Sequence, residues 1–223
     1  MTATEEKGSV RSRVLHAAAK LFLERGYQSS TLRRIADTAG VNYGSLCFAF
    51  KSKENILCEL VAYVLEAQFE ATERLLRDVT DDKILFYAAE TTLQLHIAES
   101  SEHMREMYNV SYSLPASTEI IQRQLTCKLE DIFHEQLPYF QTKDFYEREI
   151  ASGGIMRGFM SVPCDMYFTM KRKVKSFLET TFLVYEVPKD KIAEAVEFVS
   201  RFDFEAIARE TIGNMLAYLE SKT

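Results

Sequence analysis

The chain has 223 residues, of which 47% are hydrophobic, and a formal net charge of −6 at pH 7. This length allows one large domain or two smaller ones with a substantial core. No segment reaches the roughly 18 apolar residues that a membrane-spanning helix requires, so we expect no association with a membrane.

The targeting and redox features are those of a cytoplasmic protein. Residues 1–7 lack the basic-then-apolar order of a secretion signal. The four cysteines, which have no paired spacing, are Cys47, Cys58, Cys127 and Cys164. We therefore expect reduced thiols rather than a disulfide framework.

Charge is distributed unevenly along the chain. Residues 1–53 hold nine Lys or Arg and four Asp or Glu, a net charge of +5, whereas residues 54–223 hold 18 and 29, a net charge of −11. Such asymmetry indicates that one end meets a polyanion and the other does not. The alternative is a chance fluctuation among solvated helix faces.

The first 50 residues predict three helices. Apolar residues recur at helical spacing over residues 9–25, and Gly26 marks the end of that helix. A second helix, capped by Thr31 or Ser30, ends at Gly40 after two turns, and a third covers residues 43–49. Two short helices joined by a turn that contains Gly form a helix-turn-helix, which needs its neighbours to supply a core.

The remainder of the chain predicts an all-α fold, because no segment of useful length has the period of a strand. A long helix over residues 52–77 follows without a Pro- or Gly-rich linker. Later helices are expected near residues 81–99, 102–114, 117–137, 143–161, 167–185, 189–200 and 204–221. We expect a three-helix unit of residues 1–53, joined by the long helix to a larger helical part of residues 54–223.

The helix-turn-helix pattern indicates DNA binding. The second short helix of this motif enters the major groove, and the first lies across the DNA backbone. Arg33 and Arg34 lie opposite the apolar stripe of the first short helix, where they can meet phosphates or base edges. The candidate DNA-binding residues are Thr31, Arg33, Arg34, Asn42, Tyr43, Gly44, Ser45, Phe48, Lys51 and Lys53. The alternative is a three-helix protein-interaction unit.

Residues 12–57 resemble the DNA-binding domain of the TetR/AcrR family of bacterial transcriptional regulators. The matching residues are Arg13–Phe22, Gly26, Tyr27, Ser30–Ala36, Ala39–Val41, Gly44–Leu46, Phe50, Lys51, Lys53 and Glu54. The resemblance implies an all-helical homodimer. Its C-terminal domain would bind a small, largely apolar effector, and this binding would lower the affinity for a near-palindromic operator in double-stranded DNA.

Two positions depart from the family pattern. The family usually has Tyr at the position of Cys47, and Tyr or His at the position of Ala49. Both commonly touch DNA phosphates. We therefore expect a smaller footprint, or one that Phe48, Lys51 and Lys53 carry; the less favoured alternative is that DNA binding has weakened.

Two features of residues 54–223 suggest where the dimer interface and the ligand-binding site of the C-terminal domain lie. Ala151, Gly154 and Gly158 form a strip of small residues that we expect in the dimer interface, although close packing within one subunit is the alternative. Met and aromatic residues gather in the middle helices, where they suit an adaptable cavity or an ordinary core. The candidate ligand-binding residues are His96, Met104, Tyr108, Tyr112, Phe133 and Met156.

No catalytic or metal-binding constellation stands out. The chain has no Gly-rich phosphate loop, no Gly-x-Ser-x-Gly elbow and no Cys-x-x-Cys pair, and its His and Cys spacings match no ligand pattern. We expect no enzymatic activity, no cofactor and no metal. The leading hypothesis is a ligand-responsive repressor; the alternatives are a small-molecule binding protein or enzyme with weakened DNA binding, and a protein-interaction adaptor.

Overall fold

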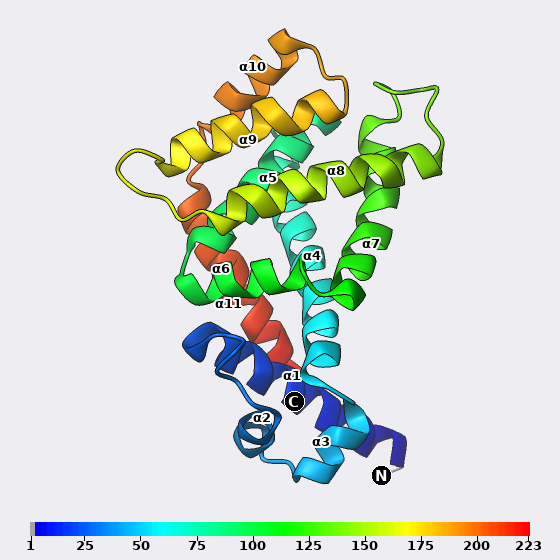
Figure 1. Cartoon of the computed structure of the whole chain (residues 1–223), viewed down its shortest axis with the longest axis vertical. Helices are drawn as coiled ribbons and strands as arrows, with labels where there is room; N and C mark the ends of the chain where they lie inside the picture. The colour runs from blue at the N-terminus through cyan, green and yellow to red at the C-terminus, as the bar shows by residue number, and fades with distance from the viewer. Residues whose placement is uncertain (1–2) are drawn as a thin grey trace.

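A computed structural model describes residues 3–223, with side chains from residue 10 onward. The side chains of residues 1–7, which lack the pattern of a secretion signal, lie outside the described part. Residues 3–223 form eleven α-helices and no strand, which confirms the all-α prediction (Figure 1). The helices are α1 (Ala3–Arg25), α2 (Leu32–Ala39), α3 (Tyr43–Ala49), α4 (Lys53–Leu76), α5 (Lys83–Glu99), α6 (Glu102–Ser111), α7 (Pro115–Phe133), α8 (Thr142–Ser161), α9 (Met170–Val184), α10 (Lys189–Val199) and α11 (Phe204–Ser221).

Helix boundaries differ from the predicted ones where side chains hold turns. The helix expected from residue 167 begins at Met170, because the Asp165 carboxylate accepts hydrogen bonds from the backbone N–H groups of Tyr167 and Phe168 at 2.7 and 2.6 Å. Those bonds keep the segment in a turn until the side chain of Thr169 caps the helix. Similarly, α7 begins at Pro115, two residues earlier than predicted, since proline suits the first position of a helix.

The three N-terminal helices share one small core with the start of α4. Val14 and Phe22 of α1, Ile35 of α2, Leu46 of α3 and Ile56 of α4 are completely buried. Neither α2 nor α3 is long enough to be stable alone, so this burial is what holds them in place. The long α4 then leaves this unit and enters the larger helical part (Figure 1).

The larger part is built around α5. Twelve of its 17 residues are buried, and it contacts α4, α6, α7, α8, α9, α10 and α11. By contrast, α8 and α9 pack against each other and present outward faces (Figure 1). A helix that is apolar all round is expected at the centre of such a bundle.

The two parts meet where α6 and α11 lie against α1 (Figure 1). The turn after α1 contains Gly26, whose φ is +80°, and a Cβ added there would collide with the Glu106 carboxylate of α6. Glycine is therefore required at this position both by the backbone conformation and by the close approach of α6.

We predict that Gly26→Ala lowers the free energy of unfolding by at least about 1–2 kcal/mol, since a left-handed residue with a Cβ is strained and the added carbon displaces Glu106. Urea denaturation measures the change. The matched control is Gly213→Ala, in an exposed turn of α11 where a Cβ meets nothing within 4 Å. That change should stabilise by roughly 0.5–1 kcal/mol. Equal effects at the two positions would contradict the argument.

Candidate nucleic-acid interface and interior cavities

Helices α2 and α3 form a helix-turn-helix whose ends are capped by their own side chains. The Thr31 hydroxyl accepts a hydrogen bond from the Arg34 N–H at 3.2 Å, and the Asn42 side chain accepts one from the Ser45 N–H at 2.7 Å. Between the helices, Gly40 adopts a φ of +63° and its N–H bonds back to α2. Thr31 and Asn42, predicted to contact DNA, therefore also define where these helices start.

The outward face of α3 carries Tyr43, Gly44 and Phe48, all of which are exposed; Phe48 is 75% exposed. Ser45 is half-buried, and Leu46 is completely buried beneath them. Two aromatic side chains that are exposed on a short helix contribute little to the core, so this face is a candidate contact surface.

The two arginines of α2 stand beside this face. Arg33 and Arg34 are exposed, and the Arg33 guanidinium lies 6.0 Å from the Tyr43 ring centre. Arg34 donates a hydrogen bond to the Ser29 carbonyl at 3.0 Å, which leaves the rest of its five-donor guanidinium available to an anion. Together they place positive charge next to the exposed residues of α3.

Lys51 and Lys53 follow α3 and differ in environment. Lys51 is exposed, whereas the Lys53 ammonium donates to the Tyr27 carbonyl at 2.7 Å and lies 4.0 Å from the Tyr27 ring centre. Burial lowers the pKa of Lys53. Lys53 therefore fixes the turn between α1 and α2. A DNA phosphate that contacts Lys53, as predicted, would have to bind the same ammonium group that already bonds to Tyr27.

Arg11 anchors α3 from α1. Its guanidinium pairs with Glu59, donates to the Ala49 carbonyl at 3.0 Å and lies 4.4 Å from the Phe50 ring centre. The last turn of α3 is thereby fixed to both α1 and α4. Cys47 and Ala49, the two departures from the family pattern, are both half-buried.

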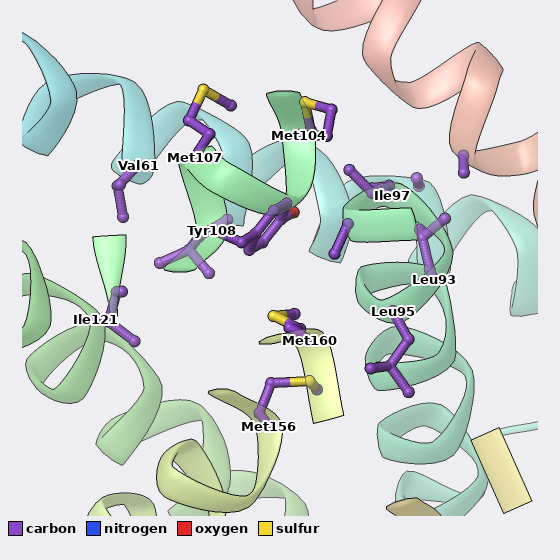
Figure 2. Packing of buried hydrophobic residues seen from close by; sticks show 14 of the residues in the cluster. Val61, Leu93, Leu95, Ile97, Met104, Met107, Tyr108, Ile121, Met156 and Met160 are labelled. Carbon is purple, nitrogen blue, oxygen red and sulfur yellow. The ribbon is translucent and has the colours of Figure 1, made fainter. Parts of the chain in front are cut away.

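Two small cavities, each of about 30 Å³, lie inside the larger helical part. The first is between α4, α6 and α7, and includes Val61, Met107 and Ile121 in its lining; the second is between α5, α7 and α8, and includes Met156. Gln94 and Tyr112 line both. Figure 2 shows the side chains from α4 to α8 that converge on this region.

Of the predicted ligand-binding residues, Tyr108 lines the first cavity, Met156 the second, and Tyr112 both. His96, Met104 and Phe133 line neither of them. His96 is half-buried against Phe204, with ring centres 5.8 Å apart, and Phe133 stacks on Tyr185 at 4.0 Å. The structure thus brings three of the six together and places the other three in the surrounding core.

Two acidic side chains are buried beside the second cavity. Glu90 is 5% and Glu149 3% exposed, and burial raises the pKa of each carboxyl group to about 8. The Glu90 Oε1 atom has no hydrogen-bond partner, while Glu149 accepts a bond from the Ser152 hydroxyl at 3.2 Å. Buried carboxyl groups are costly, so their presence beside a cavity marks a candidate site.

The strip of small residues on α8 faces outward. Ala151, Gly154 and Gly158 are exposed, and a Cβ added at either glycine meets nothing within 4 Å. These glycines are therefore not used for close packing within the subunit. Nearby apolar side chains are also exposed, with Ile150 of α8 at 49% and Leu183 of α9 at 60%.

Helix α6 connects the cavity region to the helix-turn-helix unit. On one side it carries Tyr108, which lines the first cavity. On the other, Glu106 accepts hydrogen bonds from the N–H groups of Tyr27 and Gln28 at 3.2 and 2.9 Å, and the His103 Nδ1–H donates to the Leu23 carbonyl at 2.9 Å. A movement of α6 would therefore move the turn that precedes α2.

Comparison with known proteins identifies the N-terminal unit. Residues 14–60 match the family described as bacterial regulatory proteins, tetR family. The chain is thus similar to this family over residues 14–60, which are less than half of its length. The match runs from the middle of α1 into α4 and so contains the complete helix-turn-helix.

The curated relatives match through this end of the chain. The HTH-type transcriptional repressor KstR2 of Rhodococcus jostii is 36% identical over 89 residues, which are 40% of this chain and 44% of that protein. The HTH-type transcriptional repressor BepR of Brucella suis is 38% identical over 72 residues, 32% of this chain and 33% of that protein. The matched segments thus span less than half of these relatives.

Solved structures extend the similarity to the whole fold. RolR in complex with resorcinol has a TM-score of 0.67 at 17% identity, covering 89% of this chain and 97% of that chain. Thermus thermophilus FadR in complex with lauroyl-CoA has a TM-score of 0.58 at 17% identity, covering 80% and 96%. Similarity at this level of identity shows that the fold is shared, including the larger helical part.

Among the described residues, no group of three or more His, Cys, Asp or Glu side chains is arranged to hold a metal ion. Within the same part of the chain, no helix combines the length and apolarity of a membrane span.

Three glutamates with important roles in this structure, Glu90, Glu106 and Glu149, are not predicted from the sequence. A signal for Glu90 was present, since it is the only acidic residue between positions 84 and 98 of an otherwise apolar and neutral helix. Glu106 and Glu149 carry no such signal, because each lies in a helix with other charged residues and only the tertiary fold buries or pairs them.

The buried carboxyl groups predict that stability falls as pH rises. Their pKa is about 8 in the folded chain and near 4.5 in the unfolded chain, so between these values the folded state binds more protons. The free energy of unfolding should therefore decrease from about pH 5 to about pH 8. Urea denaturation at fixed protein concentration should show a flatter profile for the Glu90→Gln, Glu149→Gln double variant. Glu210→Gln, at an exposed position, is the control, and a double variant as steep as the control would contradict the assignment.

Proposed function

We propose that the protein is a ligand-responsive transcriptional repressor that binds an operator in double-stranded DNA and leaves it when a small effector binds. The observation that carries this proposal is the α2–α3 helix-turn-helix with an outward face of Tyr43, Gly44 and Phe48 beside two exposed arginines. Relatives that match through the same segment are named transcriptional repressors, which supports repression. Action on the chromosome implies a cytoplasmic location.

In the proposed complex, α3 enters the major groove and α2 lies across the backbone. Arg33, Arg34 and Lys51 are exposed and would supply charge to phosphates, while Tyr43 and Phe48 would meet base edges or sugars. We assign residues 1–53 to the DNA-binding domain and residues 54–223 to effector binding and dimerisation. The net charge of +5 on the first segment fits a polyanionic partner.

We propose a homodimer formed through the outward faces of α8 and α9. Gly154 and Gly158 leave open space on this face, so a helix of a second subunit could approach closely. Ile150 and Leu183 would add apolar contacts. A two-fold axis here would present two α3 helices to half-sites about one DNA turn apart, roughly 34–36 Å, on a near-palindromic operator.

The effector would bind in the interior cavities and act through α6. The long α4 joins the two parts and lines the first cavity through Val61. However, Glu106 and His103 of α6 bond directly to the turn between α1 and α2, so α6 offers the shorter connection. A coupling free energy of about 1–3 kcal/mol would suffice for a several-fold to hundred-fold change in DNA affinity.

DNA binding is tested by fluorescence anisotropy with DNA from upstream of the protein's own gene and with random duplex, across a salt series. We expect tight binding that prefers the upstream DNA and weakens steeply with salt. Arg33→Ala should weaken binding and lower the salt slope by about one if the guanidinium contacts a phosphate. The control is Lys189→Ala on α10, at the opposite end of the molecule (Figure 1).

Weak binding that is equal on both DNAs and insensitive to Arg33→Ala would count against an operator-binding role. It would favour instead a small-molecule binding protein whose DNA-binding unit has weakened.

The dimer face is tested by Gly158→Glu, which would place a charged side chain into the proposed helix–helix contact. We expect the molecular mass in sedimentation equilibrium to fall from that of a dimer toward 25.7 kDa, with helix content by circular dichroism unchanged. Gly213→Glu, on an exposed turn of α11 with open space, is the matched control and should remain dimeric. A dimeric Gly158→Glu variant would show that the interface lies elsewhere.

A further inference from the structure

The second interior cavity combines an apolar lining with two acidic side chains on facing helices. Phe69 of α4, Leu129 of α7 and Met156 of α8 contribute apolar surface. Glu90 of α5 and Glu149 of α8 also line it, and both are more than nine-tenths buried. The polar part of this lining thus holds two carboxyl groups together with neutral hydroxyl and amide side chains, which are those of Tyr87, Thr91, Gln94, Tyr112 and Ser152.

The Glu90 carboxyl group is not fully satisfied by the protein around it. Glu90 Oε1 is buried without a hydrogen-bond partner, and the polar neighbours Gln94 and Tyr112 bond to each other at 2.9 Å instead. Glu149 has a weak partner in the Ser152 hydroxyl, which is also 2.8 Å from the Tyr185 hydroxyl. A buried acceptor that lines a cavity and lacks a donor indicates that the donor comes from a ligand.

Few positive charges reach this region. Lys128 of α7 is the cation that acts on Glu90, but its side chain is exposed and its ammonium lies over the Phe69 ring at 4.0 Å. The other titratable groups facing the two carboxyls are phenols: Tyr108 of α6 faces Glu90, Tyr185 faces Glu149, and Tyr87 and Tyr112 face both. A cationic group that enters the cavity would therefore meet two carboxyl groups. None of the neighbouring phenols carries a positive charge that would compete with it for them.

A surface cleft of about 640 Å³ lies on the outer side of the same wall. It runs between α4, α5 and α7, and Phe69 and Ile132 line both the cleft and the cavity. Lys128 and Asp131 lie in the cleft, so its rim is polar. Phe69 lies beneath the Lys128 ammonium and stacks on Phe86 at 6.0 Å, and a rotation of its side chain is the movement that would connect the cleft to the cavity that Glu90 lines.

We propose that the effector is an amphipathic amine, whose protonated nitrogen binds between Glu90 and Glu149 and whose apolar body fills the space toward Met107 and Met156. This inference rests on the proposed function, because it specifies the ligand of the same effector site. The ammonium N–H groups would supply the donors that Glu90 lacks, and charge-assisted bonds of this kind are the strong ones. Since each cavity is only about 30 Å³, the apolar body of the amine must displace side chains that line the cavities. Met side chains are flexible and can adopt new rotamers to make this space.

The test uses phenylalkylamines with one to six methylene groups, each paired with the phenylalkanol of the same length. Isothermal titration calorimetry and the shift in Tm report binding to the full-length protein without DNA. We expect at least one amine to bind once per subunit and at least about tenfold more tightly than its alcohol, the size of a charge-assisted bond. Glu90→Gln should remove this preference and leave alcohol binding within about twofold, which separates a direct contact from a change in cavity shape.

Glu149→Gln should reduce the preference as well, and Glu210→Gln, at an exposed position, should leave it unchanged. Alcohols that bind as tightly as their amines throughout the series would overturn the proposal, and so would an amine preference that survives Glu90→Gln. DNA binding is measured separately in the absence of amine. Failure of the repressor proposal would thus appear as loss of operator preference, whereas failure of the present one would appear only in the amine–alcohol comparison.

Discussion

The arrangement of the two domains depends on the carboxylate of Glu106, which accepts hydrogen bonds from two consecutive backbone N–H groups at the end of α1. These N–H groups belong to Tyr27 and Gln28, in a turn that cannot continue the helix because Gly26 is left-handed. Lys53 donates to the carbonyl group of the same Tyr27, so the turn is held from α6 and α4 together. This cluster fixes the turn that leads into α2, while the shared core holds α2 and α3 against α1 and α4.

The same ten-residue helix that carries Glu106 also carries cavity-lining side chains, which explains how a change inside the protein can reach DNA. Tyr108 is two residues from Glu106, and its hydroxyl accepts a hydrogen bond from the buried Gln68 of α4. A ligand that displaces the Tyr108 side chain must shift α6 or break this bond. Because interiors are close-packed, such a shift moves the helix as a unit rather than dissipating locally.

Much of the fold could be predicted from the sequence because its signals are local. Helix caps, glycines with positive φ and prolines at helix starts determine where most elements begin and end, and the third helix was predicted at the residues where it lies, Tyr43–Ala49. The interior could not be predicted in the same way. Sequence spacing does not reveal that α5 and α8 face each other, so nothing in the sequence distinguishes Glu149 from an ordinary solvent-facing acid of its helix. For the same reason, His96 could not be distinguished from a cavity residue.

The departures at Cys47 and Ala49 can be understood from how α3 is held. Leu46 and Phe50 are buried, and Arg11 binds the Ala49 carbonyl, so the two positions lie on the flank of α3 rather than on its crest. A long aromatic or imidazole side chain on a flank can reach sideways to a phosphate, whereas a thiol or a methyl group cannot. Tyr43 and Phe48, by contrast, are exposed. If these positions contact phosphates, as the family resemblance implies, their loss would lower affinity more than sequence preference, because phosphate contacts position a protein on DNA and base contacts specify the sequence.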